Sequence, residues 1–106
     1  MSRGALSQLL DAAIQPVFNP DDIIVKQGEY DQAVYVVVFG RVRVTKVSAE
    51  NPSDVSIAEL GPGEVFGELA VLESLPRSAT VVALELTSCL KVPGNEFLRA
   101  LNEPEG

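Results

Sequence analysis

One stretch of the chain concentrates side chains that could bind an anion. It begins with Gly67 and Glu68 and ends with Arg77 and Ser78, and the residues between them are typical of a short helix. A helix N-terminus presents backbone N–H groups that have no intrahelical acceptor, and a glycine there lets a ligand approach the backbone closely. Arg77 offers a planar fork of donors for phosphate oxygens. Ser78 adds one hydroxyl donor.

Glu68 has the opposite property, because an ionised carboxylate only accepts hydrogen bonds. It suits a sugar hydroxyl and not a phosphate, so the segment is complementary to a cyclic ribose phosphate. The same residues also allow a structural interpretation. Arg77 could be a surface arginine paired with Glu64 or Glu73, and Glu68 could simply stabilise the dipole of the first helical turn. Residue types and spacing leave both interpretations open.

Short apolar runs surround this segment and predict β-strands. Val42 and Val44 alternate with Arg41 and Arg43, so the valines should face inward and the arginines outward. The run 35–39 is apolar throughout and predicts a strand covered on both faces. Further strands are expected at 23–25, 55–60, 79–84 and 86–92, with turns at Gly40 and 61–63. This pattern predicts a mainly β fold, a jelly-roll-like β-roll (double-stranded β-helix), with the short helix inserted.

Helical patterns flank the predicted roll. An amphipathic helix is expected over 1–18, closed by Pro16 and Pro20, because apolar residues recur there at spacings of three and four: Leu6, Leu9, Leu10, Ala13 and Ile14. A short C-terminal helix is expected at 94–102, with Asn95 as its N-cap. The 106 residues should therefore form one domain, 1–106, with the roll at 22–92.

Composition excludes several classes of function. A net charge of −7 argues against a nucleic-acid surface and against docking on anionic lipid. The chain has no His, which removes the usual metal ligand and general base, so an enzyme of the metal-dependent cupin type is not expected. No apolar run approaches the ~20 residues of a membrane span. Cys89, the single cysteine, should be a buried free thiol and favours a reducing, cytoplasmic compartment.

The stretch 63–80 closely resembles the phosphate-binding cassette of the cyclic-nucleotide-binding domain family, which occurs in kinase A regulatory subunits, nucleotide-gated channels and catabolite-activator-type regulators. The family pattern is Phe-Gly-Glu-Leu-Ala, a short helix, and then Pro-Arg-x-Ala-Thr. Residues 66–70 and 76–80 read in this way, and the resemblance extends over roughly 6–101. It implies a non-catalytic module that binds cAMP or cGMP and needs no metal or other cofactor.

The resemblance also implies roles for individual residues. Glu68 would accept a hydrogen bond from the ribose 2′-hydroxyl, and Arg77 would pair with the exocyclic phosphate oxygens. Other donors of the cradle would be the Ser78 hydroxyl and the backbone N–H groups of Gly67, Glu68, Leu69, Ala70 and Ala79. The base would rest on Val44, Ile57, Ala58 and Leu69, although a place in the core explains each of these equally well. A hydroxyl residue in the place of Ser78 often accompanies cGMP in the family, yet bacterial cAMP receptors carry it too, and we favour cAMP.

Family members usually continue into a longer helix that covers the base as a lid. Here about seven helical residues follow Asn95 before Pro104, so the lid is expected to be absent, to lie elsewhere, or to come from a second subunit in a homodimer. Ligand binding would shift the flanking helices and bias an effector domain or protein. The alternative is a degenerate domain of the same fold that binds no nucleotide and serves as a protein-interaction element. The intact pair of Glu68 and Arg77 argues against that alternative.

Overall fold

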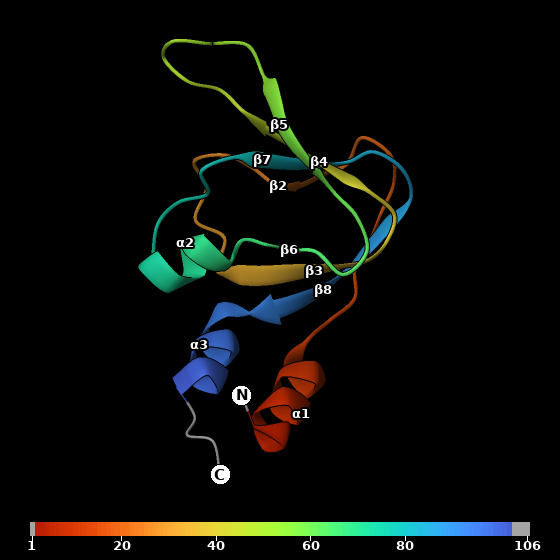
Figure 1. Cartoon of the computed structure of the whole chain (residues 1–106), viewed down its shortest axis with the longest axis vertical. Coiled ribbons are helices and arrows are strands. Elements are labelled where there is room, and N and C mark those ends of the chain that lie inside the picture. Colours follow the sequence, from red (N-terminus) through yellow and green to blue (C-terminus); the bar gives the residue numbers. More distant parts are fainter. Residues whose placement is uncertain (1, 103–106) are drawn as a thin grey trace.

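The computed structural model describes residues 2–102, which form two four-stranded antiparallel sheets and three helices (Figure 1). The helices are α1 (Arg3–Ala12), α2 (Glu68–Glu73) and α3 (Gly94–Asn102). The strands are β1 (Val17–Phe18), β2 (Ile23–Val25), β3 (Ala33–Phe39), β4 (Val42–Lys46), β5 (Val55–Leu60), β6 (Val65–Phe66), β7 (Thr80–Ala83) and β8 (Thr87–Pro93). One sheet has the order β1-β8-β3-β6 and the other β2-β7-β4-β5. The predicted mainly β, jelly-roll-like fold is confirmed.

Two apolar clusters hold these layers together. The larger lies between the sheets and contains Tyr35, Val42, Phe66 and Cys89 among its buried members. The smaller joins the sheet of β3 and β8 to helices α1 and α3, which pack below it in Figure 1. Cys89 is a buried free thiol, as expected, and burial raises its pKa to about 11.

Strand β3 shows where the helices stop covering the sheet. Its first half is buried on both faces, since Tyr35 points into the larger cluster and Val34 into the smaller one. Near its end Val38 is 40% and Phe39 43% exposed. The prediction that 35–39 is covered on both faces is therefore wrong for the second half, because α1 and α3 reach only the beginning of the strand.

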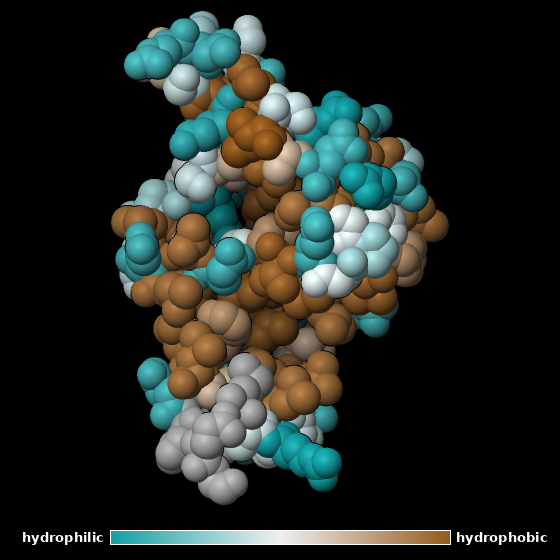
Figure 2. All heavy atoms as spheres, viewed as in Figure 1, coloured by the Kyte–Doolittle hydropathy of each residue, from teal (hydrophilic) through white to brown (hydrophobic). Residues whose placement is uncertain are grey.

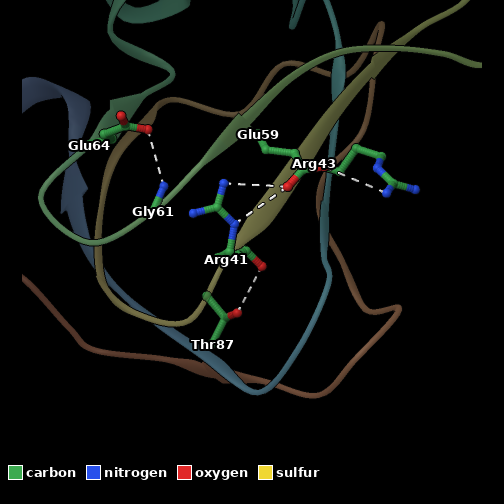
Figure 3. A network of polar contacts seen from close by, with 6 residues as sticks. All are labelled: Arg41, Arg43, Glu59, Gly61, Glu64 and Thr87. Carbon is green, nitrogen blue, oxygen red and sulfur yellow. Dashed lines mark hydrogen bonds and ion pairs between the residues drawn. The ribbon is translucent and has the colours of Figure 1, made fainter.

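Strand β4 alternates as the sequence predicts, with Val42 fully buried and its two neighbouring arginines exposed. These arginines and one residue of β5 form the arginine cluster (Arg41, Arg43 and Glu59; Figure 3). The Glu59 carboxylate lies 3.4 Å from a guanidinium nitrogen of Arg41 and 3.8 Å from one of Arg43. Strand β5 is one of the two outer strands of its sheet, and a β-bulge opposite β4 leaves Ile57 without a cross-strand partner within residues 2–102.

The helix on the N-terminal side of the roll is shorter than predicted. Helix α1 ends at Ala12, so the expected helix over 1–18 is too long. Ile14 instead exchanges both backbone hydrogen bonds with Lys91, at 3.1 and 2.7 Å, because the edge of β8 offers those partners. Pro16 then prevents a return to helix.

At the C-terminal side, α3 coincides with the expected range 94–102. It begins at Gly94, so Asn95 lies in its first turn and is not the N-cap. Pro104 lies outside the described residues. No helix within residues 2–102 is long and apolar enough to cross a membrane.

Candidate functional site

Arg77 is the most deeply buried charged residue of the cassette, with only 4% of its surface exposed. Its NH2 group donates to an oxygen of the Asp31 carboxylate at 3.1 Å and also to the backbone carbonyl of Ala33. The guanidinium carbon lies 5.8 Å from the centre of the Tyr35 ring. The interpretation of Arg77 as a surface residue paired with Glu64 or Glu73 is therefore wrong, because the residue is buried and its carboxylate partner is Asp31.

The backbone of Arg77 is fixed from the opposite side by the turn that follows β2. The N–H of Arg77 donates to the Glu29 carbonyl at 2.9 Å, and the N–H of Gly28 donates to the Arg77 carbonyl at 2.8 Å. These two bonds join segments that lie almost fifty residues apart in the sequence. They hold the base of the side chain while Asp31 and Ala33 hold its end.

Most of the hydrogen-bonding capacity of Arg77 is not used by the residues that the structure describes. Its Nε and NH1 atoms are buried, and neither has a hydrogen-bond partner among residues 2–102. The buried Oε2 atom of Glu68 also has none. Leaving a buried polar group unpaired costs about 1–3 kcal/mol, and more for a charged group. Two donors and one acceptor of this kind in one place therefore indicate a ligand that satisfies them.

These groups surround a cavity of about 180 Å³. Its lining contains all the residues predicted for the phosphate and ribose: Gly67, Glu68, Leu69, Ala70, Arg77, Ser78 and Ala79. Figure 2 shows the molecule hollowed between α2 and the projecting hairpin of β4 and β5. The volume is below the roughly 300–1,000 Å³ of sites that enclose a whole small molecule, so the cavity suits part of a nucleotide.

Gly67 is required by its conformation and by its neighbours. It lies before the first residue of α2 with a φ of 91°, which favours glycine. A Cβ atom at this position would lie 2.1 Å from NH1 of Arg77, so any side chain would displace the guanidinium. Within the described range 2–102, no side-chain hydrogen bond caps α2. The first N–H groups of the helix have no intrahelical acceptor and border the cavity.

The predicted base-binding residues divide into two groups. Val25, Val81, Val44 and Ala58 are direct cross-strand neighbours and form one apolar row on the inner face of the sheet. Val25, Val81 and Val44 line the cavity, and Ala58 continues the row beyond it. Ile57 lies apart: it is the bulged residue, is 57% exposed and borders a separate hollow beside the β4–β5 loop.

Asp31 is the functional residue that the sequence analysis missed. It lies in the loop before β3, 46 positions from Arg77. The one available signal was an acidic residue between the turn at Gly28 and the apolar strand. Among residues 2–102, no group of three or more His, Cys, Asp or Glu side chains is placed to hold a metal ion.

Most of the chain matches one protein family. The family model described as "Cyclic nucleotide-binding domain" matches residues 15–103, a range that includes the cavity and every residue that lines it. The chain belongs to the cyclic nucleotide-binding domain family. The resemblance drawn from the cassette is thereby confirmed, and the family is regulatory and not catalytic.

Individual relatives of this cyclic nucleotide-binding domain come from kinases. The chain is 36% identical over 90 residues to a cAMP-dependent protein kinase regulatory subunit of Dictyostelium discoideum, covering 82% of this chain and 28% of the relative. It is also 36% identical over 86 residues to a cGMP-dependent protein kinase of Plasmodium berghei, covering 81% of this chain and 9% of the relative. The chain thus spans less than a third of either protein.

A solved structure shares the fold closely. It is the regulatory subunit of a cAMP-independent protein kinase A from Trypanosoma brucei, in a mutant form bound to cAMP in the A site. The TM-score is 0.87 at 28% identity, and the match covers 95% of this chain and 37% of that one.

Proposed function

We propose that this domain binds cAMP, with Arg77 pairing with the cyclic phosphate, and that it passes the binding state to an effector. The observation that carries the proposal is the buried guanidinium of Arg77 beside the cavity, in which two donor atoms have no partner among residues 2–102. Phosphate oxygens can accept from these donors, and charge-assisted hydrogen bonds of this kind are roughly twice as strong as those between neutral groups.

The other groups of the cavity suit the rest of a cyclic ribose phosphate. The buried oxygen of Glu68 is an acceptor, as a 2′-hydroxyl requires. The free amides at the start of α2 and the Ser78 hydroxyl supply further donors. Because the cavity is small, the base would extend along the apolar row towards Ala58, against Val44 and the exposed side chain of Leu69.

The choice of cAMP over cGMP rests on the same surfaces. The row formed by Val25, Val81, Val44 and Ala58 offers no side-chain hydrogen bonds to the amino and carbonyl groups that distinguish guanine. Ser78 is the one residue of the cavity lining with a side-chain hydroxyl. The related kinases are named for both nucleotides, so titration with each of them tests the base preference.

A second candidate is a domain of the same fold that binds no nucleotide and acts as a protein-interaction element. The fold match to a protein described as cAMP-independent favours it. The buried atoms of Arg77 and Glu68 that lack a partner among residues 2–102 argue against it, because a domain without a ligand would bear their energetic cost with no compensating contact.

The domain is a binding module and not an enzyme, and it takes no cofactor besides the nucleotide. The effector lies in another domain or protein. A homodimer and a cytoplasmic location stay predictions.

Calorimetric titration with cAMP, cGMP and 5′-AMP tests the proposal. The wild-type domain should bind cAMP more tightly than cGMP, and 5′-AMP weakly. Arg77→Ala should weaken cAMP binding at least tenfold, because a hydrogen bond to a charged group contributes about 1.5–3 kcal/mol, or roughly 10- to 150-fold. Arg41→Ala is the matched control and should bind as the wild type does. Titrations that stay flat to millimolar concentrations of both cyclic nucleotides would support the second candidate instead.

A further inference from the structure

The two oxygens of the Asp31 carboxylate have different partners. Oδ1 accepts from the N–H of Ala33 at 3.1 Å and from NH2 of Arg77 at 3.1 Å. Oδ2 accepts from the hydroxyl of Tyr35 at 3.0 Å. Asp31 therefore contacts the guanidinium through one oxygen and one nitrogen, although arginine and carboxylate side chains frequently pair through two parallel bonds.

The missing second bond decides which donors of Arg77 stay available. In a two-bond pair with Asp31, Oδ2 would accept from a second nitrogen of the guanidinium. That nitrogen would be Nε or NH1, since NH2 is already engaged by Oδ1, and these are the two atoms without a partner among residues 2–102. The Tyr35 hydroxyl holds the oxygen that would make this bond, and its hydrogen bond fixes the direction in which the carboxylate faces.

Tyr35 is well suited to hold its hydroxyl in place. It is 2% exposed, and its ring is stacked on Phe66, with ring centres 4.9 Å apart and planes 3° from parallel. Burial raises the pKa of Tyr35 above its usual range, and the nearby Asp31 carboxylate raises it further through its charge and hydrogen bond. The hydroxyl therefore stays protonated and remains a donor at physiological pH.

We propose that the Tyr35 hydroxyl is a positioning group, which restrains Asp31 to a single-oxygen contact and so keeps two donors of Arg77 free for an anionic ligand. The proposal rests on the proposed function, because it needs Arg77 to bind the phosphate. Asp31 fixes the orientation of the guanidinium, and Tyr35 prevents Asp31 from competing with the ligand.

The first test is Tyr35→Phe, which keeps the ring and its stacking on Phe66 and removes only the hydroxyl. Asp31 is then free to turn and pair with a second nitrogen of Arg77, which the phosphate must displace. Affinity for cAMP, measured by calorimetry, should fall about three- to tenfold, while the melting temperature confirms that the variant is folded. An affinity equal to that of the wild type contradicts the proposal.

The second test adds Asp31→Asn, alone and combined with Tyr35→Phe. An amide carries no charge and has one acceptor oxygen, so it competes poorly with phosphate for Arg77. Removing the hydroxyl should therefore have no further effect on cAMP affinity in the Asp31→Asn background. An equal loss in both backgrounds would mean that Tyr35 acts only on the packing of the domain, and the proposal would be wrong.

A readout without nucleotide separates this proposal from the proposed function. The NMR signal of the Arg77 Nε–H group in the ligand-free domain should shift in Tyr35→Phe and shift less in the double variant. If wild-type protein failed to bind cAMP while this signal behaved as expected, the proposed function would fall and the restraint on Asp31 would stand. An unchanged signal in Tyr35→Phe would contradict the restraint itself.

Discussion

Arg77 and Arg41 occupy opposite environments, although each forms an ion pair with one carboxylate. The side chain of Arg77 is 3% exposed and lies 3.1 Å from Asp31, whereas that of Arg41 is 49% exposed and lies 3.4 Å from Glu59. Nε and NH2 of Arg41 both donate to one oxygen of Glu59, each at 3.4 Å (Figure 3). At Arg77 two donors are buried without a partner among residues 2–102.

This contrast indicates that burial, more than residue type or ion pairing, distinguishes an arginine with unused buried donors from one on the surface. An exposed pair contributes only about 0.2–1 kcal/mol, because water competes for both charges. A buried guanidinium with unused donors is unfavourable by itself and needs a rigid support. Here that support comes from the backbone bonds to Glu29 and Gly28 and from the contacts with Asp31 and Ala33.

The largest effect expected from disturbing this support follows a change at Gly67. Gly67→Ala places a methyl group against NH1 of Arg77 and should weaken cAMP binding more than tenfold. Gly63→Ala is the matched control, since Gly63 has a similar φ of 86° but open space where a Cβ would lie. Both variants should lose about 1–2 kcal/mol of unfolding free energy from backbone strain, measured by urea denaturation.

Only Gly67→Ala should lose affinity in calorimetry. Equal losses in the two variants would show that backbone strain, and not displacement of the guanidinium, governs binding.

A smaller effect is expected at the acceptor side of the cavity. Glu68→Gln replaces a charged acceptor with a neutral one and should lower cAMP affinity about fivefold, since bonds to charged groups are worth roughly 1 kcal/mol more than neutral ones. The free energy of unfolding without ligand should stay the same or rise, because a buried amide is easier to desolvate than a carboxylate.

Glu64→Gln is the control for this change, because the Glu64 carboxylate is exposed and only accepts from the Gly61 N–H at 3.1 Å. It should leave affinity unaltered. A 2′-deoxy form of cAMP should bind wild type and Glu68→Gln equally. If the wild type bound the deoxy ligand fivefold more tightly than Glu68→Gln does, Glu68 would not act through the ribose 2′-hydroxyl.

The smallest effect is expected in the arginine cluster. Glu59→Gln removes the charge that both Arg41 and Arg43 contact, and should lower the unfolding free energy by less than about 1 kcal/mol. The loss should shrink further at high salt, where exposed charges are screened. Urea denaturation at two salt concentrations measures it. A loss of several kcal/mol, or any loss of cAMP affinity, would contradict the conclusion that the exposed pair of Arg41 contributes little to stability and nothing to binding.

Much of the site was predictable because its residues are neighbours in the sequence. Gly67, Glu68 and Arg77 lie within one segment, and their chemistry follows from residue type and spacing. The partner of Arg77 was not predictable, because Asp31 reaches it through the folding of a separate loop. Nearer acidic residues in the cassette were the natural candidates, and nothing in their spacing shows that they are on the surface.

The fold was predictable where strands are long enough to show a period. Strands β1 and β6 have two residues each, too few for any alternation, and both were missed. Helix α1 was predicted too long because Ile14 continues its apolar spacing, although that residue pairs with Lys91 of β8. In both cases tertiary partners, and not local preference, decided the structure.

The bulge at Ile57 has a consequence for how the domain behaves at high concentration. Outer strands expose unpaired backbone groups that another molecule could extend into a shared sheet, which is a route to fibrils. An extra residue shifts the donors and acceptors of β5 out of step and twists the strand. Regular backbone pairing with a second chain would be interrupted midway along β5, which is the longest outer strand within residues 2–102. The bulge should therefore disfavour aggregation through this edge.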